Sequence, residues 1–397
     1  MKKVLVSSLL SACAVAASAA PFITVGDQLD IFFRGAVIGN YNSNITYASQ
    51  NKIDDYAGTL RLGGEMDYGR QSKFKANLKV HEDLTKYVDH KEFDSNLLHI
   101  AANTSYTEAS WSVAAYFKFD QNRDNTSDTT VLAGNDGLLV RYNNWNAGVK
   151  GSYDFSEKIY GTVGFDWLRK EFVGSDKLGP WSDVYASYDI YSVPVSLLYR
   201  VTQKISVGLS YQYRHTDYFD GPSYYENLYG TERDDHFIGV TATGEIAPKL
   251  TCEVYIGAQN RSTPETMLRE SEDSWSFTGN ITLGYEVSEK LGVYVRGSRD
   301  FGGSATRENI IYTTVEGGLN YYFNPKVVGT ASLSYQDGNY QSTDRTDHTI
   351  WTRVGVSYMP NKFFSFGVNY NYLNNESNVS YACYQQHIVS FNANLKY

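Results

Sequence analysis

The stretch WSFTGNITLGY, residues 275–285, alternates between two kinds of side chain. One set is largely apolar: Trp275, Phe277, Gly279, Ile281, Leu283 and Tyr285. The other set is small or polar: Ser276, Thr278, Asn280, Thr282 and Gly284. Because successive side chains of a strand point to opposite faces, this period of two predicts a strand with one apolar face. Its length suits a tilted strand that crosses a bilayer.

The same alternation recurs along most of the chain, as in WSVAAYFKF (111–119), ISVGLSYQYR (205–214) and the terminal HIVSFNANLKY (387–397). It becomes unclear over 138–145, where a β-bulge is one explanation. We predict eighteen strands, with sixteen to twenty tolerated, at residues 29–41, 56–68, 73–83, 96–106, 111–120, 138–153, 159–170, 183–199, 205–216, 236–246, 250–260, 274–286, 291–300, 309–322, 327–336, 348–358, 363–373 and 386–397.

Short and long connections alternate between these segments. The short turns are polar and follow an aromatic residue, as in YDFSEKI (153–159) and YEVSEKL (285–291), whereas 120–136 and 217–235 are long polar loops. Short periplasmic turns and long extracellular loops are typical of outer-membrane barrels. We therefore predict an all-β fold, a transmembrane antiparallel up-and-down β-barrel with both termini periplasmic. A soluble sandwich is the alternative, but no segment forms a core that could cover so many apolar faces.

The first residues have the pattern of an export signal. A basic start, a short apolar run and the small residues Ala17-Ser18-Ala19 predict a signal peptide over 1–19 and a barrel domain over 20–397. Leu10-Ser11-Ala12-Cys13 resembles a lipobox and leaves lipoprotein processing at Cys13 as an alternative. Cys252 and Cys383 are expected to be free thiols.

Composition narrows the classes of partner. The chain has 44 acidic against 35 basic residues, which argues against nucleic acid as a partner. It is rich in Tyr (34) and Gly (33), and its mean hydropathy is −0.41. A barrel tolerates such a polar composition, because only alternate strand residues face lipid. Nothing in the composition or motifs implies a cofactor.

A family resemblance lies at the two ends of the chain. In PFITVGDQLDIFFRGAVIGNYNSNI (21–45), a Gly-Asp pair precedes an apolar first strand and an Asn-rich loop. This segment resembles the start of outer-membrane β-barrel porins of Gram-negative bacteria, including barrel proteins linked to exopolysaccharide gene clusters. The terminal strand resembles the signal that the barrel-assembly machinery reads, at Phe391, Leu395 and Tyr397. The resemblance implies outer-membrane lipid, lipopolysaccharide and that machinery as partners. A homo-trimer is conventional among porins, and no pattern in this sequence tests it.

No catalytic or metal-binding motif is apparent. The seven histidines, at 81, 90, 99, 215, 236, 348 and 387, lack metal-ligand spacing to a cysteine or to each other. Nucleophile-elbow and phosphate-loop motifs are also missing from the sequence. We therefore predict no metal site, no catalytic residue and no enzymatic activity. A barrel hydrolase stays open as an alternative, because strand residues distant in sequence can converge.

Charged residues recur at the polar positions of the predicted strands. Those expected to line the lumen are Arg61, Glu65, Lys75, Lys79, Lys118, Lys150, Asp166, Arg214, Glu253, Arg296, Glu316 and Arg353. Cations outnumber anions in this set, which predicts a pore with mild anion preference. The alternative is a salt-bridged plug, although eighteen strands enclose enough space for an aqueous channel.

Other residues are assigned to the two rims. Tyrosines beside the short turns are expected to form a periplasmic aromatic girdle: Tyr68, Tyr106, Tyr153, Tyr199, Tyr285, Tyr321 and Tyr358. Acidic residues in the expected loops, Asp235 and Asp347 among them, either bridge divalent cations to lipopolysaccharide or simply face water.

Together these patterns predict a porin for the passive diffusion of small polar solutes. Two other classes stay open. One is an accessory or export barrel for polysaccharide, and the other is a structural or adhesive barrel whose surface loops do the work.

Overall fold

The computed structural model describes residues 21–124, 139–173, 185–221, 223–267 and 270–397. The predicted signal peptide and Cys13 lie outside these ranges.

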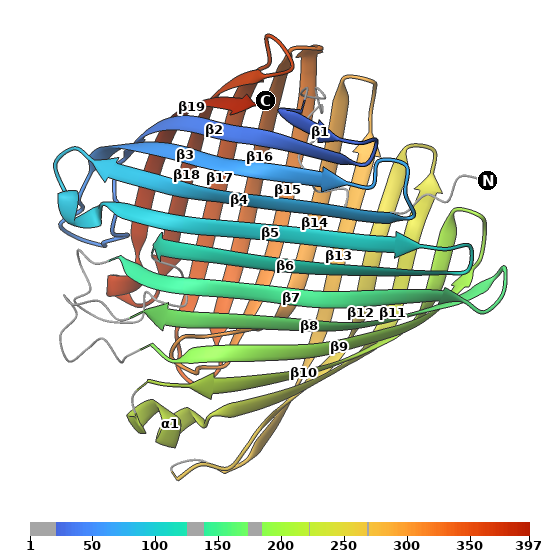
Figure 1. Cartoon of the computed structure of the whole chain (residues 1–397). Coiled ribbons are helices and arrows are strands. Elements are labelled where there is room, and N and C mark those ends of the chain that lie inside the picture. Colours follow the sequence, from blue (N-terminus) through green and yellow to red (C-terminus); the bar gives the residue numbers. More distant parts are fainter. Residues whose placement is uncertain (1–20, 125–138, 174–184, 222, 268–269) are drawn as a thin grey trace.

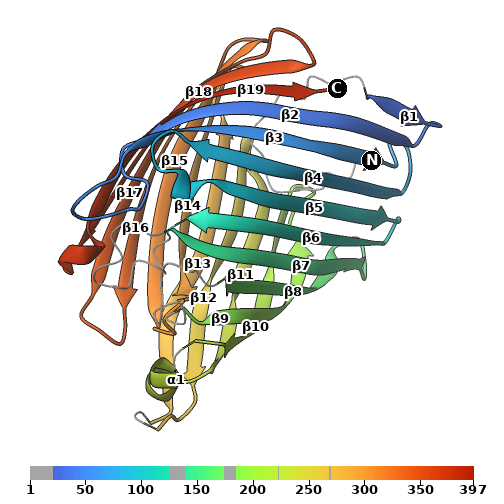
Figure 2. The same ribbon diagram turned by 60° about the vertical axis from the view of Figure 1, so that its left-hand side comes forward.

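One antiparallel sheet forms a closed wall, because β19 pairs with β2 and β9 pairs with β10 (Figures 1 and 2). The elements are β1 (Ile23–Val25), β2 (Leu29–Asn42), β3 (Asp55–Tyr68), β4 (Phe74–Tyr87), η1 (Lys91–Phe93), β5 (Ser95–Thr107), β6 (Trp111–Asp124), β7 (Val140–Asp154), β8 (Ile159–Val173), β9 (Ser187–Arg200), β10 (Ile205–Phe219), α1 (Ser223–Tyr229), β11 (Glu232–Ala247), β12 (Leu250–Thr263), β13 (Glu272–Glu286), β14 (Leu291–Gly302), β15 (Ile310–Asn324), β16 (Val327–Tyr340), β17 (Thr346–Tyr358), β18 (Phe364–Ser377), η3 (Ser380–Ala382) and β19 (Tyr384–Lys396). Within the described ranges, no helix has the length and apolar character that crossing a bilayer requires.

The predicted all-β up-and-down barrel is confirmed, with its eighteen strands running from β2 to β19. The sequence pattern missed β1, a three-residue strand that pairs with the start of β2. Gly26, at φ +58°, turns the chain between them. The bulge considered over 138–145 is wrong, because β6 and β7 pair in unbroken register up to Asp124 and Val140. Register shifts instead occur beside short turns, at 245–247 and 322–324.

The outer face of the barrel is apolar. Leu209, Val240 and Ile256 form one row across β10, β11 and β12, and their exposed fractions are 68%, 49% and 44%. Ser210 and Thr241, one residue away, point to the inner face, where their hydroxyl oxygens lie 2.6 Å apart. An apolar surface that continues around a closed sheet is stable in hydrocarbon and costly in water.

The two described ends of the chain meet where the barrel closes. Phe33 N donates to Tyr397 O at 2.6 Å, and Tyr397 N donates to Phe33 O at 3.0 Å. The Tyr397 ring also packs against Phe22 and against Phe363 of the last short turn. Both ends therefore lie on the side of the short turns, and the long loops lie on the other side, with α1 at the lower left of Figure 1. Cys252 and Cys383 are free thiols, as expected.

Candidate functional site in the barrel lumen

The strand register places the twelve predicted lining residues on one face. Leu60 and Leu62 are exposed on the outer face of β3, so Arg61 between them points inward. Following the paired residues from strand to strand gives the same face to the rest of the set, namely Glu65, Lys75, Lys79, Lys118, Lys150, Asp166, Arg214, Glu253, Arg296, Glu316 and Arg353.

The most concentrated positive charge on the inner face surrounds Glu65. This carboxylate is 5% exposed and lies 3.0 Å from Lys396 Nζ, 3.1 Å from Arg34 Nε and 3.8 Å from Lys79 Nζ. Four consecutive strands of the wall, β19, β2, β3 and β4, each contribute one of these side chains. Lys75, on the same face of β4, forms no ion pair with any described residue. We call Arg34, Glu65, Lys75, Lys79 and Lys396 the cationic wall, in which three of the four cations pair with Glu65. Asp67 is the next carboxylate on the same face of β3 and bonds to Asn77.

Most other predicted lining charges are paired. Arg61 donates to both oxygens of Asp83, at 2.7 and 2.6 Å. Lys118 Nζ lies 2.5 Å from Asp120, and Tyr116 donates to Asp166 at 2.7 Å. Further round the wall, Arg296 and Arg353 approach the two oxygens of Glu316, at 3.8 and 3.7 Å. These pairs fit a polar lumen in which part of the positive charge is compensated, although Arg296 and Arg353 share one carboxylate and Lys150 forms no ion pair with any described residue.

Arg214 belongs to a buried network near the long loops. It contacts Asp235 at 2.7 Å and Asp300 at 2.9 Å, and Arg261 contacts Asp235 from the other side at 2.7 Å. The expectation that Asp235 lies in a solvated loop is wrong, because β11 begins at Glu232 and Asp235 is fully buried. Asp347 is likewise buried and bonded to Arg345. Guanidinium groups replace water around both carboxylates, so neither aspartate is available to bridge a cation to lipopolysaccharide.

One connection, residues 303–309 between β14 and β15, folds over the lumen, and we call it the inward loop. Its residues Ser304, Ala305 and Thr306 are almost completely buried. Ala305 O accepts a hydrogen bond from Ala186 N, at 2.7 Å, beside the start of β9. Around the wall, β9 is five strands from β14, about 24 Å at about 4.8 Å per strand. The loop therefore cuts across the end of the barrel, a position that the sequence pattern did not reveal.

Arginines from the wall hold the inward loop in place. Arg233 of β11 donates to Arg307 O at 2.8 Å, and Arg261 of β12 donates to Asn309 Oδ1 at 3.3 Å. Arg307 itself has φ +64° and donates to Asp220 O at 2.7 Å. A left-handed backbone at a residue with a side chain is strained, so these contacts must fix the loop in this conformation.

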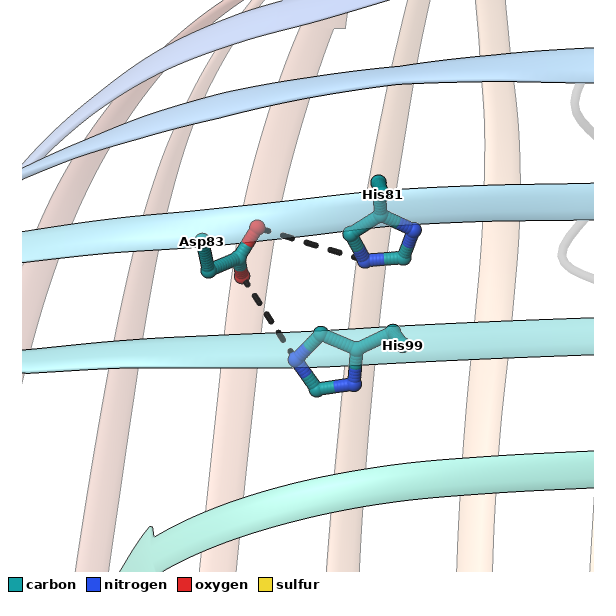
Figure 3. A group of neighbouring side chains, drawn as sticks. All are labelled: His81, Asp83 and His99. Atoms are coloured by element: carbon teal, nitrogen blue, oxygen red, sulfur yellow. Dashed lines mark ion pairs between the residues drawn. The ribbon is translucent and has the colours of Figure 1, made fainter.

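Two histidines that are distant in sequence meet on the inner face. His81 of β4 and His99 of β5 are direct cross-strand partners, and their rings stack with centroids 4.8 Å apart. Figure 3 shows Asp83 facing both rings, with its oxygens 4.0 Å from each Nε2. His99 Nδ1 lies 2.9 Å from Asp120 Oδ1. The view of these histidines as scattered is corrected here, since pairing of β4 with β5 brings them together. The period of two already puts Lys79, His81 and Asp83 on one face, but the register of β5 was unknown.

The residues predicted for the periplasmic rim lie on the outer face. The seven girdle tyrosines are half-buried to exposed and sit in the strands beside the short turns, at Tyr68, Tyr106, Tyr153, Tyr199, Tyr285, Tyr321 and Tyr358. In β19, Phe391 and Leu395 point outward, and Tyr397 follows them at the strand end. For the tyrosines, an outward position beside a short turn allows the ring to lie in lipid and the hydroxyl to lie near water.

The chain is similar to one protein family and to several solved structures. Residues 225–397 match the family described as "Putative beta-barrel porin 2". No curated protein sequence matches the chain. Among solved structures, the outer membrane protein OpdK of Pseudomonas aeruginosa has 11% identity and a TM-score of 0.48, over 93% of this chain and 99% of that one. OccK2 (OpdF) of the same organism has 9% identity and a TM-score of 0.48, over 93% and 98%.

A longer structure is also similar. The FrpB iron transporter of Neisseria meningitidis has 10% identity and a TM-score of 0.49, over 89% of this chain. The aligned part is only 62% of the FrpB chain. With its family match over 225–397 and its closed barrel of eighteen strands with an apolar outer face, the chain resembles the β-barrel porins and is an outer-membrane protein.

Proposed function

We propose that this protein is a passive channel for small polar solutes with a mild preference for anions. The observation that carries the proposal is the cationic wall, where Arg34, Lys75, Lys79 and Lys396 face the lumen with Glu65 as the one anion in contact. Unbalanced positive charge on a pore wall concentrates anions and repels cations. Elsewhere on the inner face the charges are largely paired, so this wall dominates the sign of the field.

Two further features support a channel in preference to a filled interior. Barrels of sixteen to eighteen strands are wide enough for an aqueous channel. On β10 and β12 the inner face carries Gly208 and Gly257, which add no side chain to the lumen. The inward loop narrows the long-loop end of the lumen, whereas the cationic wall lies near the short-turn end, beside the start of β4 and the end of β19.

The remaining expectations are part of the same proposal. Residues 1–19 act as the export signal, and Phe391, Leu395 and Tyr397 are read by the barrel-assembly machinery. Lipopolysaccharide surrounds the long-loop end, and a trimer is the assembly that we propose from porin convention alone. We propose no catalytic step.

Single-channel recording tests the proposal directly. Purified protein is refolded in detergent and inserted into planar bilayers with different KCl concentrations on the two sides. A stable open conductance supports the proposal if its reversal potential has the same sign as the equilibrium potential of chloride. A barrel that folds but stays silent contradicts the channel, and a cation-selective conductance contradicts the role of the cationic wall.

A further inference from the structure

We propose that His81, Asp83 and His99 form a binding site for a zinc ion, or for a transition-metal ion of similar preference, on the inner wall of the barrel. Among the described residues, this is the one group of three His, Cys, Asp or Glu side chains whose ligand atoms all approach within 4.8 Å. Two imidazoles and a carboxylate are a ligand set that zinc accepts, with its fourth position open to water or a solute.

The distances suit a shared ion. Each Nε2 lies 4.0 Å from an oxygen of Asp83, which is too long for a direct hydrogen bond. Ligand atoms lie about 2.0–2.2 Å from zinc, so two atoms that share one ion are at most about 4.4 Å apart. Small rotations of the two rings bring all three atoms into that range, and Figure 3 shows both Nε2 atoms directed toward Asp83.

The surroundings orient the ligands. The contact of His99 Nδ1 with Asp120, at 2.9 Å, favours the tautomer that keeps Nε2 free to bind metal. Asp83 is fixed by both donors of Arg61, and each carboxylate oxygen keeps a second lone pair for an ion. All three ligand side chains are only partly buried, with exposed fractions between 13% and 28%, so an ion can reach them from the lumen.

The local charge neither requires nor forbids a cation. Arg61 balances Asp83, and Lys118 balances Asp120, so the pocket is close to neutral when both imidazoles are uncharged. We infer that selectivity comes from the nitrogen ligands. Imidazole favours zinc, copper and nickel, whereas magnesium and calcium prefer oxygen ligands throughout.

Calorimetric titration of refolded, chelator-washed protein with ZnCl2 tests the site. We expect one zinc ion per chain and no heat of binding with MgCl2. His81→Gln and His99→Gln should each weaken zinc binding by about tenfold or more, the scale seen when a metal site loses a supporting group. Each variant keeps a polar side chain of similar size in the lumen, and its altered migration on heating in detergent gels reports whether it has folded.

His387→Gln is the matched control, because His387 faces the lipid side of β19 and contacts Tyr370 and Tyr372 instead of an acid. It should bind zinc like the unmodified protein. Zinc binding that survives in both His81→Gln and His99→Gln, or no zinc binding by the folded protein, would overturn the proposal. If one variant fails to fold, the other variant and the zinc-against-magnesium comparison still decide.

A second measurement rests on the proposed channel function. In planar bilayers, zinc should alter conductance and favour anions further in the unmodified protein, and should have no effect in His99→Gln. The two proposals fail separately: a silent barrel that binds zinc contradicts the channel alone, and a conducting barrel that gives no heat of zinc binding contradicts the metal site alone.

Discussion

Lys396, the penultimate residue of the chain, lies 3.0 Å from Glu65 of β3, across the intervening strand β2. Its ammonium group also lies 4.2 Å from the centre of the Phe32 ring. The last strand is therefore tied to the first strands by side chains as well as by backbone hydrogen bonds. The same contact contributes charge to the cationic wall, so closure of the barrel and the electrostatics of its lumen depend on shared residues.

Glu65→Gln should destabilise the barrel at this seam. Without the carboxylate, Arg34, Lys79 and Lys396 repel one another and lose their common acceptor, at a cost of about 1–3 kcal/mol. The urea midpoint of unfolding in detergent should fall. Glu108→Gln is the control, since Glu108 forms an exposed pair with Lys73 at a short turn, and it should leave the midpoint unchanged. An unchanged midpoint in Glu65→Gln would contradict the structural role of the cluster.

Neutralising Lys75, Lys79 and Lys118 to glutamine should reduce anion preference. A unit charge about 10 Å from an ion contributes about 0.4 kcal/mol in water, and salt at 0.1 M reduces this about threefold. Each positive charge attracts chloride and repels potassium, so removing three of them changes the difference between the two ions by about 0.8 kcal/mol. The chloride-to-potassium permeability ratio should therefore fall about fourfold. The reversal potential in a KCl gradient measures this ratio.

Three lysines outside the lumen provide the control for this charge change. Lys73, Lys204 and Lys290 lie in short turns, and their triple glutamine variant should keep the original reversal potential. A shift in the control equal to that in the lumen variant would show that net charge, and not its position on the inner wall, sets selectivity.

Strand alternation was sufficient to predict the fold, and the reason is physical. Lipid and water select opposite side chains at neighbouring positions such as Leu209 and Ser210, so the pattern survives in most of the strands. It also gave the inner face for Arg61 and Glu65. It could not give cross-strand register, so the meeting of His81 with His99 and of Lys396 with Glu65 became visible only in the structure. The course of the inward loop depends on contacts with β9 and β11 that leave no periodic signal.

Leu209→Arg should be far more harmful than Gln212→Arg in the same strand. Leu209 faces lipid, where arginine near the middle of the bilayer costs about 2–4 kcal/mol. Gln212 faces the lumen, where the guanidinium stays hydrated. Unfolding in lipid vesicles with increasing urea measures both changes, and equal loss of stability in the two variants would contradict the assignment of the two faces.

Tyr397→Ser should impair assembly in cells more than folding in vitro. The ring contacts Phe22 and Phe363, while the backbone bonds to Phe33 do not depend on the side chain. We expect a lower amount of folded protein in the outer membrane and a normal yield on refolding in detergent. Tyr153→Ser, at the same rim, is the control for loss of a girdle tyrosine. Equal assembly of the two variants would contradict a special role for the terminal residue.

The inward loop should respond to pH through Glu308. Burial raises the pKa of its carboxyl, and nearby Asp347 acts in the same direction, against the Thr306 hydroxyl and Arg345. A raised pKa means that the docked loop binds its proton more tightly than the released loop. Docking is therefore favoured most below the ordinary glutamate pKa of about 4.3, and this contribution is lost as pH rises through the raised value.

Acidification should therefore strengthen the constriction and lower single-channel conductance, whereas Glu308→Gln should hold the loop docked at neutral pH and remove most of this pH dependence. Glu270→Gln, in an exposed part of a neighbouring loop, should keep the original profile. Because glutamine resembles the protonated carboxyl in shape and charge, the variant at pH 7 should match the unmodified protein at acidic pH. Identical pH profiles for Glu308→Gln and the unmodified channel would show that the carboxyl does not control the loop.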